Sequence, residues 1–167
     1  SHILINNYTL QIVQTKGGSS REMGIATSIA AFAEMPTMFL FSFYLKRMKC
    51  RTMLYVSGVF FTLKCFGSYL VKTMMGFYAV QFLQMFGWGL LTVALVYYVN
   101  EVMDQRDSIK GQGYAATAYT LGSVIGALFG GSLADRVGID AMLLFGTVVA
   151  AVGTIIIFFS VREKKAA

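Results

Sequence analysis

The chain has 167 residues, of which 56% are hydrophobic and 13% are charged, and its formal net charge is +6. Soluble domains are about 25% charged, and a domain of this size cannot bury so much apolar surface. The composition excludes a soluble enzyme and a disordered tail. Two cysteines without spaced partners form neither a disulfide scaffold nor a metal site. We expect an integral membrane protein with no metal and no cofactor.

Apolar runs follow one another along the chain, and a helix needs about 20 apolar residues to span a bilayer. The first run, 2–14, is short and contains polar residues, so we interpret it as the outer end of a truncated helix. Full spans are predicted at 23–44, 53–71, 77–103, 111–134 and 141–161. The runs do not alternate as β-barrel strands do, so the predicted fold is an all-α membrane protein.

Basic residues predict the orientation, because cytoplasmic loops are enriched in Lys and Arg. Nine lie on one side of the predicted membrane and four on the other. The nine are Lys46, Arg47, Lys49, Arg51, Arg106, Lys110, Arg162, Lys164 and Lys165, and the four are Lys16, Arg21, Lys72 and Arg136. We therefore expect a multi-pass protein of the cell (inner) membrane, in contact with lipid, with its C-terminus in the cytoplasm. No basic stripe carries interleaved stacking aromatics, so nucleic acid is not an expected partner.

Glu34 is the most informative residue, because it lies halfway along the span 23–44. A carboxylate at mid-bilayer is costly, so it faces a cavity or a partner and is a candidate for proton or substrate binding. Pro36 can bend the same helix. The structural alternative is a carboxyl group that only bonds to neighbouring helices.

Further polar residues lie inside the predicted spans. Lys64 either pairs with Glu34 in a cavity or extends towards an interface. His2 and Asn6 are one helical turn apart, and with Asn7 they predict either a hydrated, substrate-binding face or hydrogen bonds between helices. His2 is also a candidate for proton coupling, because an unperturbed imidazole titrates near neutral pH.

A third polar group follows helical spacing in the span 77–103. Gln81, Gln84, Trp88 and Thr92 are separated by three, four and four residues, which places them on one face of a continuous helix. Amides and an indole suit a polyhydroxylated or ring-shaped solute, and packing between helices is the alternative.

Gly122, Gly126 and Gly130 repeat every four residues, a pattern that lets another helix approach closely. Simple helix packing is the expected role of these glycines, although a smooth face of this kind could also serve a helix that slides against a neighbour.

Three parts of the chain resemble the C-terminal half of a major facilitator superfamily transporter. They are SHILINNY with TKGGSSREMGIA, AEMPTMFLFSFYLKRMKCRTML, and the stretch from YYVNEV to IDAMLL. The closest branch holds oligosaccharide- and nucleoside-proton symporters, related to lactose permease. The resemblance implies six helices of a twelve-helix fold, from the end of the seventh to the twelfth, with the N-terminal half as partner. It implies transport of a small polar solute together with protons by alternating access.

Individual motifs carry this resemblance to different degrees. Glu34 falls on the eighth helix, where lactose permease has a carboxylate used in sugar binding and proton coupling. GGSLADRVG (130–138) is similar to a superfamily signature that usually follows the second and eighth helices, but here it precedes the last span. The permease's His, Arg and Glu set on its ninth and tenth helices has no clear match.

Two functions of different class follow from these patterns. In the first, the chain is half of a proton-coupled transporter, with Glu34 as the coupling carboxylate and Gln81, Gln84 and Trp88 as substrate contacts. In the second, it is a non-transporting membrane subunit that packs through the glycine face. A membrane enzyme is not expected, because one carboxylate and one histidine on different spans do not form a nucleophile–base pair.

Overall fold

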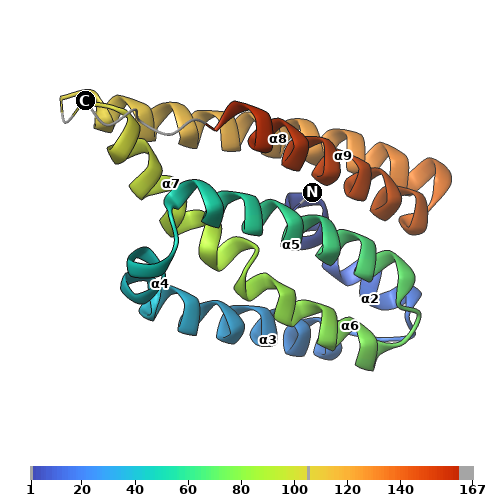
Figure 1. Ribbon diagram of the computed structural model, residues 1–167. Coiled ribbons are helices and arrows are strands. Elements are labelled where there is room, and N and C mark those ends of the chain that lie inside the picture. The colour runs from blue at the N-terminus through green and yellow to red at the C-terminus, as the bar shows by residue number, and fades with distance from the viewer. Residues whose placement is uncertain (1, 105, 162–167) are drawn as a thin grey trace.

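The computed structural model describes residues 2–104 and 106–161, and within these ranges every regular element is a helix (Figure 1). In chain order they are α1 (His2–Asn7), α2 (Thr9–Thr15), α3 (Ser20–Phe39), α4 (Phe41–Arg47), α5 (Cys50–Leu70), α6 (Met74–Gln81), the 3-10 helix η1 (Phe82–Met85), α7 (Trp88–Val102), α8 (Ser108–Val137) and α9 (Ile139–Ser160). Four helical stretches are long and apolar enough to cross a membrane, and a fifth is obtained if α3 and α4 form one bent span.

The elements divide into continuous and broken helices. The predicted ranges 53–71, 111–134 and 141–161 each fall on one continuous helix: α5, α8 and α9. The other predicted ranges each contain a break. Tyr8 separates α1 from α2, Leu40 separates α3 from α4 with a bend of 55°, and η1 separates α6 from α7.

Local sequence explains where two of the helices begin. The Ser19 hydroxyl accepts a hydrogen bond from a backbone N–H of the first turn of α3, and the Glu22 carboxylate accepts one from the Ser19 N–H at 2.9 Å. This capping box starts α3 at Ser20, three residues before the predicted span 23–44 begins. Gly138, at φ +101°, forms the turn that reverses the chain from α8 into α9.

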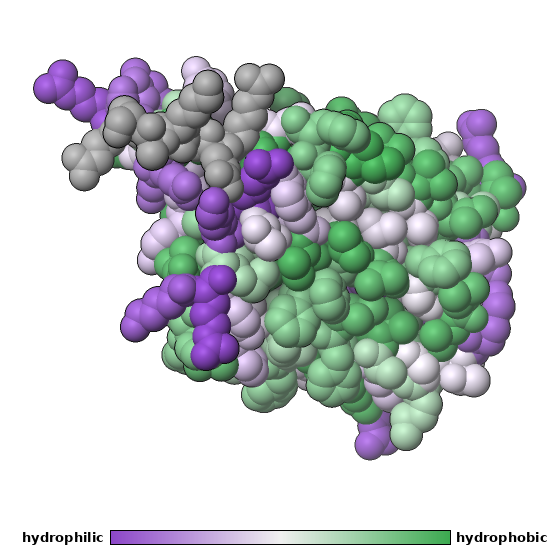
Figure 2. Space-filling view, viewed as in Figure 1, coloured by the Kyte–Doolittle hydropathy of each residue, from purple (hydrophilic) through white to green (hydrophobic). Residues whose placement is uncertain are grey.

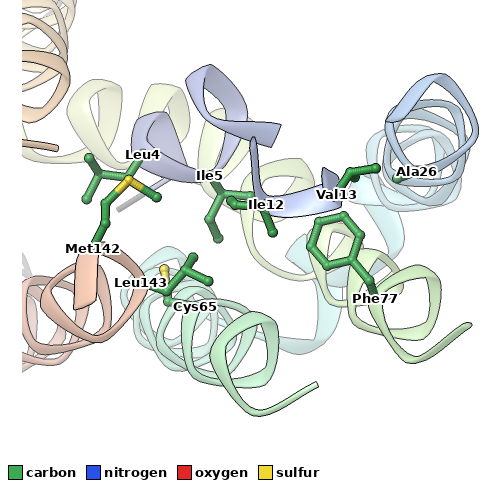
Figure 3. Packing of buried hydrophobic residues seen from close by; sticks show 9 residues of the cluster. All are labelled: Leu4, Ile5, Ile12, Val13, Ala26, Cys65, Phe77, Met142 and Leu143. Carbon is green, nitrogen blue, oxygen red and sulfur yellow. The ribbon is translucent and has the colours of Figure 1, made fainter. Parts of the chain in front are cut away.

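The main apolar core joins the first helices to the rest of the bundle (Figure 3). Leu4, Ile5, Ile12 and Val13 of α1 and α2 pack against residues from four other helices. These are Ala26 of α3, Cys65 of α5, Phe77 of α6, and Met142 and Leu143 of α9. The core therefore fixes the position of α1 and α2 between the other helices.

The outer surface fits a bilayer. In Figure 2, apolar side chains cover most of the face between two ends where hydrophilic side chains gather. At one end, the Tyr55 hydroxyl of α5 donates a hydrogen bond to the Phe158 carbonyl of α9 at 3.1 Å. Arg162, Lys164 and Lys165, which count towards the predicted orientation, lie outside the described residues.

Candidate functional site

Gln84 is the centre of a polar cluster inside the bundle. Its Oε1 accepts a hydrogen bond from Nζ of Lys64 on α5. Its Nε2 lies 2.8 Å from Oε1 of Glu34 on α3 and 2.8 Å from Nε2 of His2 on α1. Asn6 Nδ2 lies 3.2 Å from the same His2 nitrogen. One amide thus connects three helices that are distant in sequence, and it uses both its donor and its acceptor groups to do so.

The break between α6 and α7 positions this amide. Gln84 lies in η1, and Gly87, which follows it, has φ −75° and ψ −89°, so the regular α-helical geometry is interrupted between α6 and α7. The Gly87 carbonyl accepts hydrogen bonds from the Leu91 N–H of α7 at 3.1 Å and from the Ser57 hydroxyl of α5 at 2.8 Å, so α5 adds a hydrogen bond at this break. A Cβ at Gly89 would lie 3.4 Å from the backbone of Glu34, so this glycine lets α7 pass close to α3.

The side chains of this cluster are buried, and burying polar and charged groups costs free energy. Lys64 is 2% exposed and Gln84 3% exposed, whereas Glu34 is half-buried. The predicted ion pair between Lys64 and Glu34 does not form, because Gln84 lies between them. Lys64 does not extend to an interface either, so both sequence interpretations of this residue are corrected. Buried polar groups that are fully hydrogen-bonded fix a unique geometry, and intramembrane charges are functional candidates.

A pocket of about 380 Å³ opens beside Glu34. The residues that line it are Asn6, Thr9, Met23, Thr27, Ala30, Ala31, Glu34, Gln81 and Gln84. The lining thus offers a carboxylate, three amides and two hydroxyls, a set that can donate and accept hydrogen bonds with a hydroxyl-rich solute. Lys64 lies behind Gln84 and does not line the pocket.

Two polar residues of this lining are absent from the sequence prediction. Thr27 precedes Ala31 by four residues, which in turn precedes Glu34 by three, so all three share one face of α3. That spacing could have identified Thr27. Thr9 has no comparable signal, because it follows the break at Tyr8 and its hydroxyl donates to the Ile5 carbonyl at 2.6 Å.

The sequence profile of the Major Facilitator Superfamily matches residues 3–167, nearly the whole chain. The chain belongs to the Major Facilitator Superfamily. Members of this superfamily are membrane transporters of small solutes, so the polar pocket lies in a transporter fold. No curated protein and no solved structure was found to match the chain.

Trp88 does not line the polar pocket beside Glu34. Its indole stacks on the His2 imidazole, with ring centroids 4.3 Å apart and an interplanar angle of 3°. It lines a separate cavity of about 350 Å³, together with His2, Phe61 and Tyr119 among others. Gln81 and Gln84 line the pocket together, but the prediction that Trp88 joins them there is wrong. Trp88 and Gln84 instead meet at His2, which Gln84 contacts through Nε2.

Asn7 is exposed on α1 and does not line the pocket, whereas its neighbour Asn6 does. Successive residues of a helix point about 100° apart, so only one of the two asparagines faces Glu34. The predicted substrate-binding face therefore does not include Asn7.

The three glycines that repeat every four residues in α8 have different surroundings. A Cβ at Gly130 would lie 2.1 Å from the Leu4 side chain of α1, so this glycine does allow a close approach. A Cβ at Gly122 or Gly126 would meet no atom of the described chain within 4 Å. Among these three glycines, the close approach is therefore seen in the described chain at Gly130, while Gly122 lines the cavity that also contains His2.

Proposed function

We propose that this protein is a proton-coupled symporter of small hydroxyl-rich solutes, sugar- or nucleoside-like, of the branch related to lactose permease. The observation that carries the proposal is the cluster in which Gln84 joins Glu34, His2 and Lys64 beside a polar pocket. Glu34 is the only acidic residue of the pocket lining, so it is the group that binds a proton or a solute hydroxyl there.

The donor and acceptor set supports a neutral, hydroxylated solute. Gln81 and Asn6 can each donate and accept a hydrogen bond, and Thr27 adds a hydroxyl from the same face of α3 as Glu34. A solute that lacks the matching hydroxyls would leave these groups unpaired, which gives the site its selectivity. The small side chains Ala30 and Ala31 leave room for the solute beside Glu34.

Gln84 connects the protonation of Glu34 to side chains on other helices. Its Nε2 donates to the carboxylate, while its Oε1 accepts from Lys64. When Glu34 takes up a proton, it becomes a poorer acceptor and can donate to a bound solute instead. Gln84 is then free to rearrange, and His2 and Lys64, which lie on α1 and α5, lose the geometry that the amide fixed.

The remaining parts of the proposal concern the whole transporter. The chain corresponds to the C-terminal six-helix half, with the substrate between it and the N-terminal half near the midplane. The end that carries Lys46, Arg47 and Lys110 faces the cytoplasm, as does the C-terminus, and the membrane is the cell (inner) membrane. Gly122 and Gly126, whose faces are open in this chain, support a contact with the other half rather than a packing role inside this one.

The test is solute-driven proton uptake by the full-length protein in proteoliposomes, with a screen of sugars and nucleosides. We expect one solute class to make the external medium more alkaline, and we expect Glu34→Gln to abolish this proton movement. Glu101→Gln is the matched control, because Glu101 is an exposed acid outside the pocket and its loss should leave symport intact. Proton-driven uptake that persists in Glu34→Gln would contradict the coupling role.

A further inference from the structure

α4 forms the basic end of the bent span that it makes with α3. The two helices reach the apolarity of a membrane span only together, with a bend of 55° between them. The last turn of α4 carries Lys46 and Arg47, so this turn lies at the edge of the membrane. Phe41 is buried against α5 and α7 and holds α4 in this position.

The surface of α4 combines apolar and basic side chains. Phe39 is 84% exposed and Phe43 is 49% exposed. Lys46 and Arg47 follow in the last turn and are exposed as well. The Arg47 guanidinium lies 4.4 Å from the centroid of the Phe43 ring. Aromatic rings next to Lys and Arg are the composition of helices that lie in the interface between acyl chains and headgroups.

The segment itself carries basic residues and no acids. The sequence contains no Asp or Glu from position 35 to position 100, and Lys49 continues the basic run that begins at Lys46. Glu101 of α7 approaches this region in space, where it forms a hydrogen bond with Cys50. Basic clusters directly beside a transmembrane helix attract anionic lipid headgroups, at about 1 kcal/mol for each charge. A guanidinium also binds a phosphate group with two parallel hydrogen bonds.

We infer that α4 is a binding surface for anionic phospholipid. Lys46 and Arg47 bind the phosphate groups of the leaflet in which α4 lies, and the exposed rings of Phe39 and Phe43 contact the acyl chains below. The site is independent of the polar pocket, because none of these residues lines it. Lipid binding at α4 can therefore be tested independently of the proposed transport reaction.

The experiment measures which lipid lies next to α4 in the full-length protein. An environment-sensitive fluorophore is attached at Ser42→Cys, an exposed position of α4, while Cys50 and Cys65 are buried and protected from labelling. The protein is reconstituted in vesicles that contain brominated phosphatidylglycerol or brominated phosphatidylcholine. We expect phosphatidylglycerol to quench the fluorescence at lower mole fraction, and this preference to weaken at high salt.

Neutralisation of the basic pair should remove the preference. Each of Lys46→Gln and Arg47→Gln is expected to lower the relative affinity for phosphatidylglycerol about fivefold. Arg136→Gln, at the opposite end of the bundle, is the matched control and should leave quenching at α4 unchanged. Equal quenching by the two lipids would overturn the inference. Weak quenching by both would do the same, since it would mean that protein covers α4.

Discussion

The continuous and the broken helices of this bundle differ in what they contribute to the polar pocket. Every residue that lines the polar pocket comes from a broken helix: α1 and α2, α3, or α6 with η1. The continuous helices α5, α8 and α9 contribute nothing to the lining, and α5 supplies only Lys64, from behind Gln84. The regular helices thus form a frame, while the interrupted ones present polar groups.

The physical reason lies in the membrane itself. Backbone groups outside regular helices are tolerated at membrane depth only where protein or a water-filled cavity satisfies them. The break at η1 meets this condition, because the Gly87 N–H donates to the Leu83 carbonyl at 3.0 Å and the Gly87 carbonyl accepts from the Leu91 N–H at 3.1 Å. Discontinuous helices at a substrate site are a general feature of secondary transporters. Here the frame adds a further hydrogen bond, from Ser57 of α5 to the same Gly87 carbonyl.

The largest effect should come from the residue that joins the two groups of helices. Gln84→Leu leaves Lys64 buried without its acceptor, so we expect transport to fall at least about 100-fold and the free energy of unfolding to drop by about 3 kcal/mol. Uptake in proteoliposomes and thermal unfolding measure the two quantities. Gln14→Leu, at an exposed position of α2, should change neither.

A double substitution separates stability from transport. Lys64→Met in the Gln84→Leu background removes both partners of the buried hydrogen bond, and we expect most of the stability to return while transport stays lost. If transport returned as well, the cluster would be structural only, and the distinction between frame and pocket would fail.

A smaller effect is expected where the continuous helix α8 meets the broken helix α1. Gly130→Leu would collide with Leu4, and the overpacking should lower the free energy of unfolding by about 1–3 kcal/mol. Gly113→Leu, on the same helix, is the matched control, because its side chain would enter space that the described chain leaves open and Gly113 is outside the proposed contact with the other half. Thermal unfolding of the two variants in detergent should differ, and equal melting temperatures would contradict the packing seen at Gly130.

The smallest effect concerns the hydrogen bond that α5 adds at the break. Ser57→Ala removes one of the two hydrogen bonds that the Gly87 carbonyl accepts, and the Leu91 N–H keeps the other at 3.1 Å. The loss of one buried hydrogen bond should cost about 1 kcal/mol of unfolding free energy. Thr147→Val provides the comparison, because that hydroxyl bonds only to Leu143 of its own helix. A melting temperature for Ser57→Ala as high as that of Thr147→Val would show that the break needs no support from α5.

Much of this arrangement can be predicted from the sequence, since long apolar runs identify helices and polar residues within them are conspicuous. Glu34, Lys64 and Gln84 all stand out in this way. Their connections do not, because the position of each side chain depends on the breaks. The helical spacing of Gln84 and Trp88 predicts one face, and both side chains do contact His2, but only Gln84 lines the polar pocket. Gly87 and Gly89 stand beside the break, but glycine alone does not show which side chains line which cavity.

The position of Lys64 has a consequence for the biogenesis of the protein. A lysine at the centre of a transmembrane helix opposes membrane insertion by about 2.5–3.5 kcal/mol. Its hydrogen-bond acceptor, Gln84, follows 20 residues later in the chain, in η1, so α5 inserted alone would carry the ammonium into the bilayer without this partner. Insertion of α5 together with α6 and η1 would provide the acceptor and offset part of this cost.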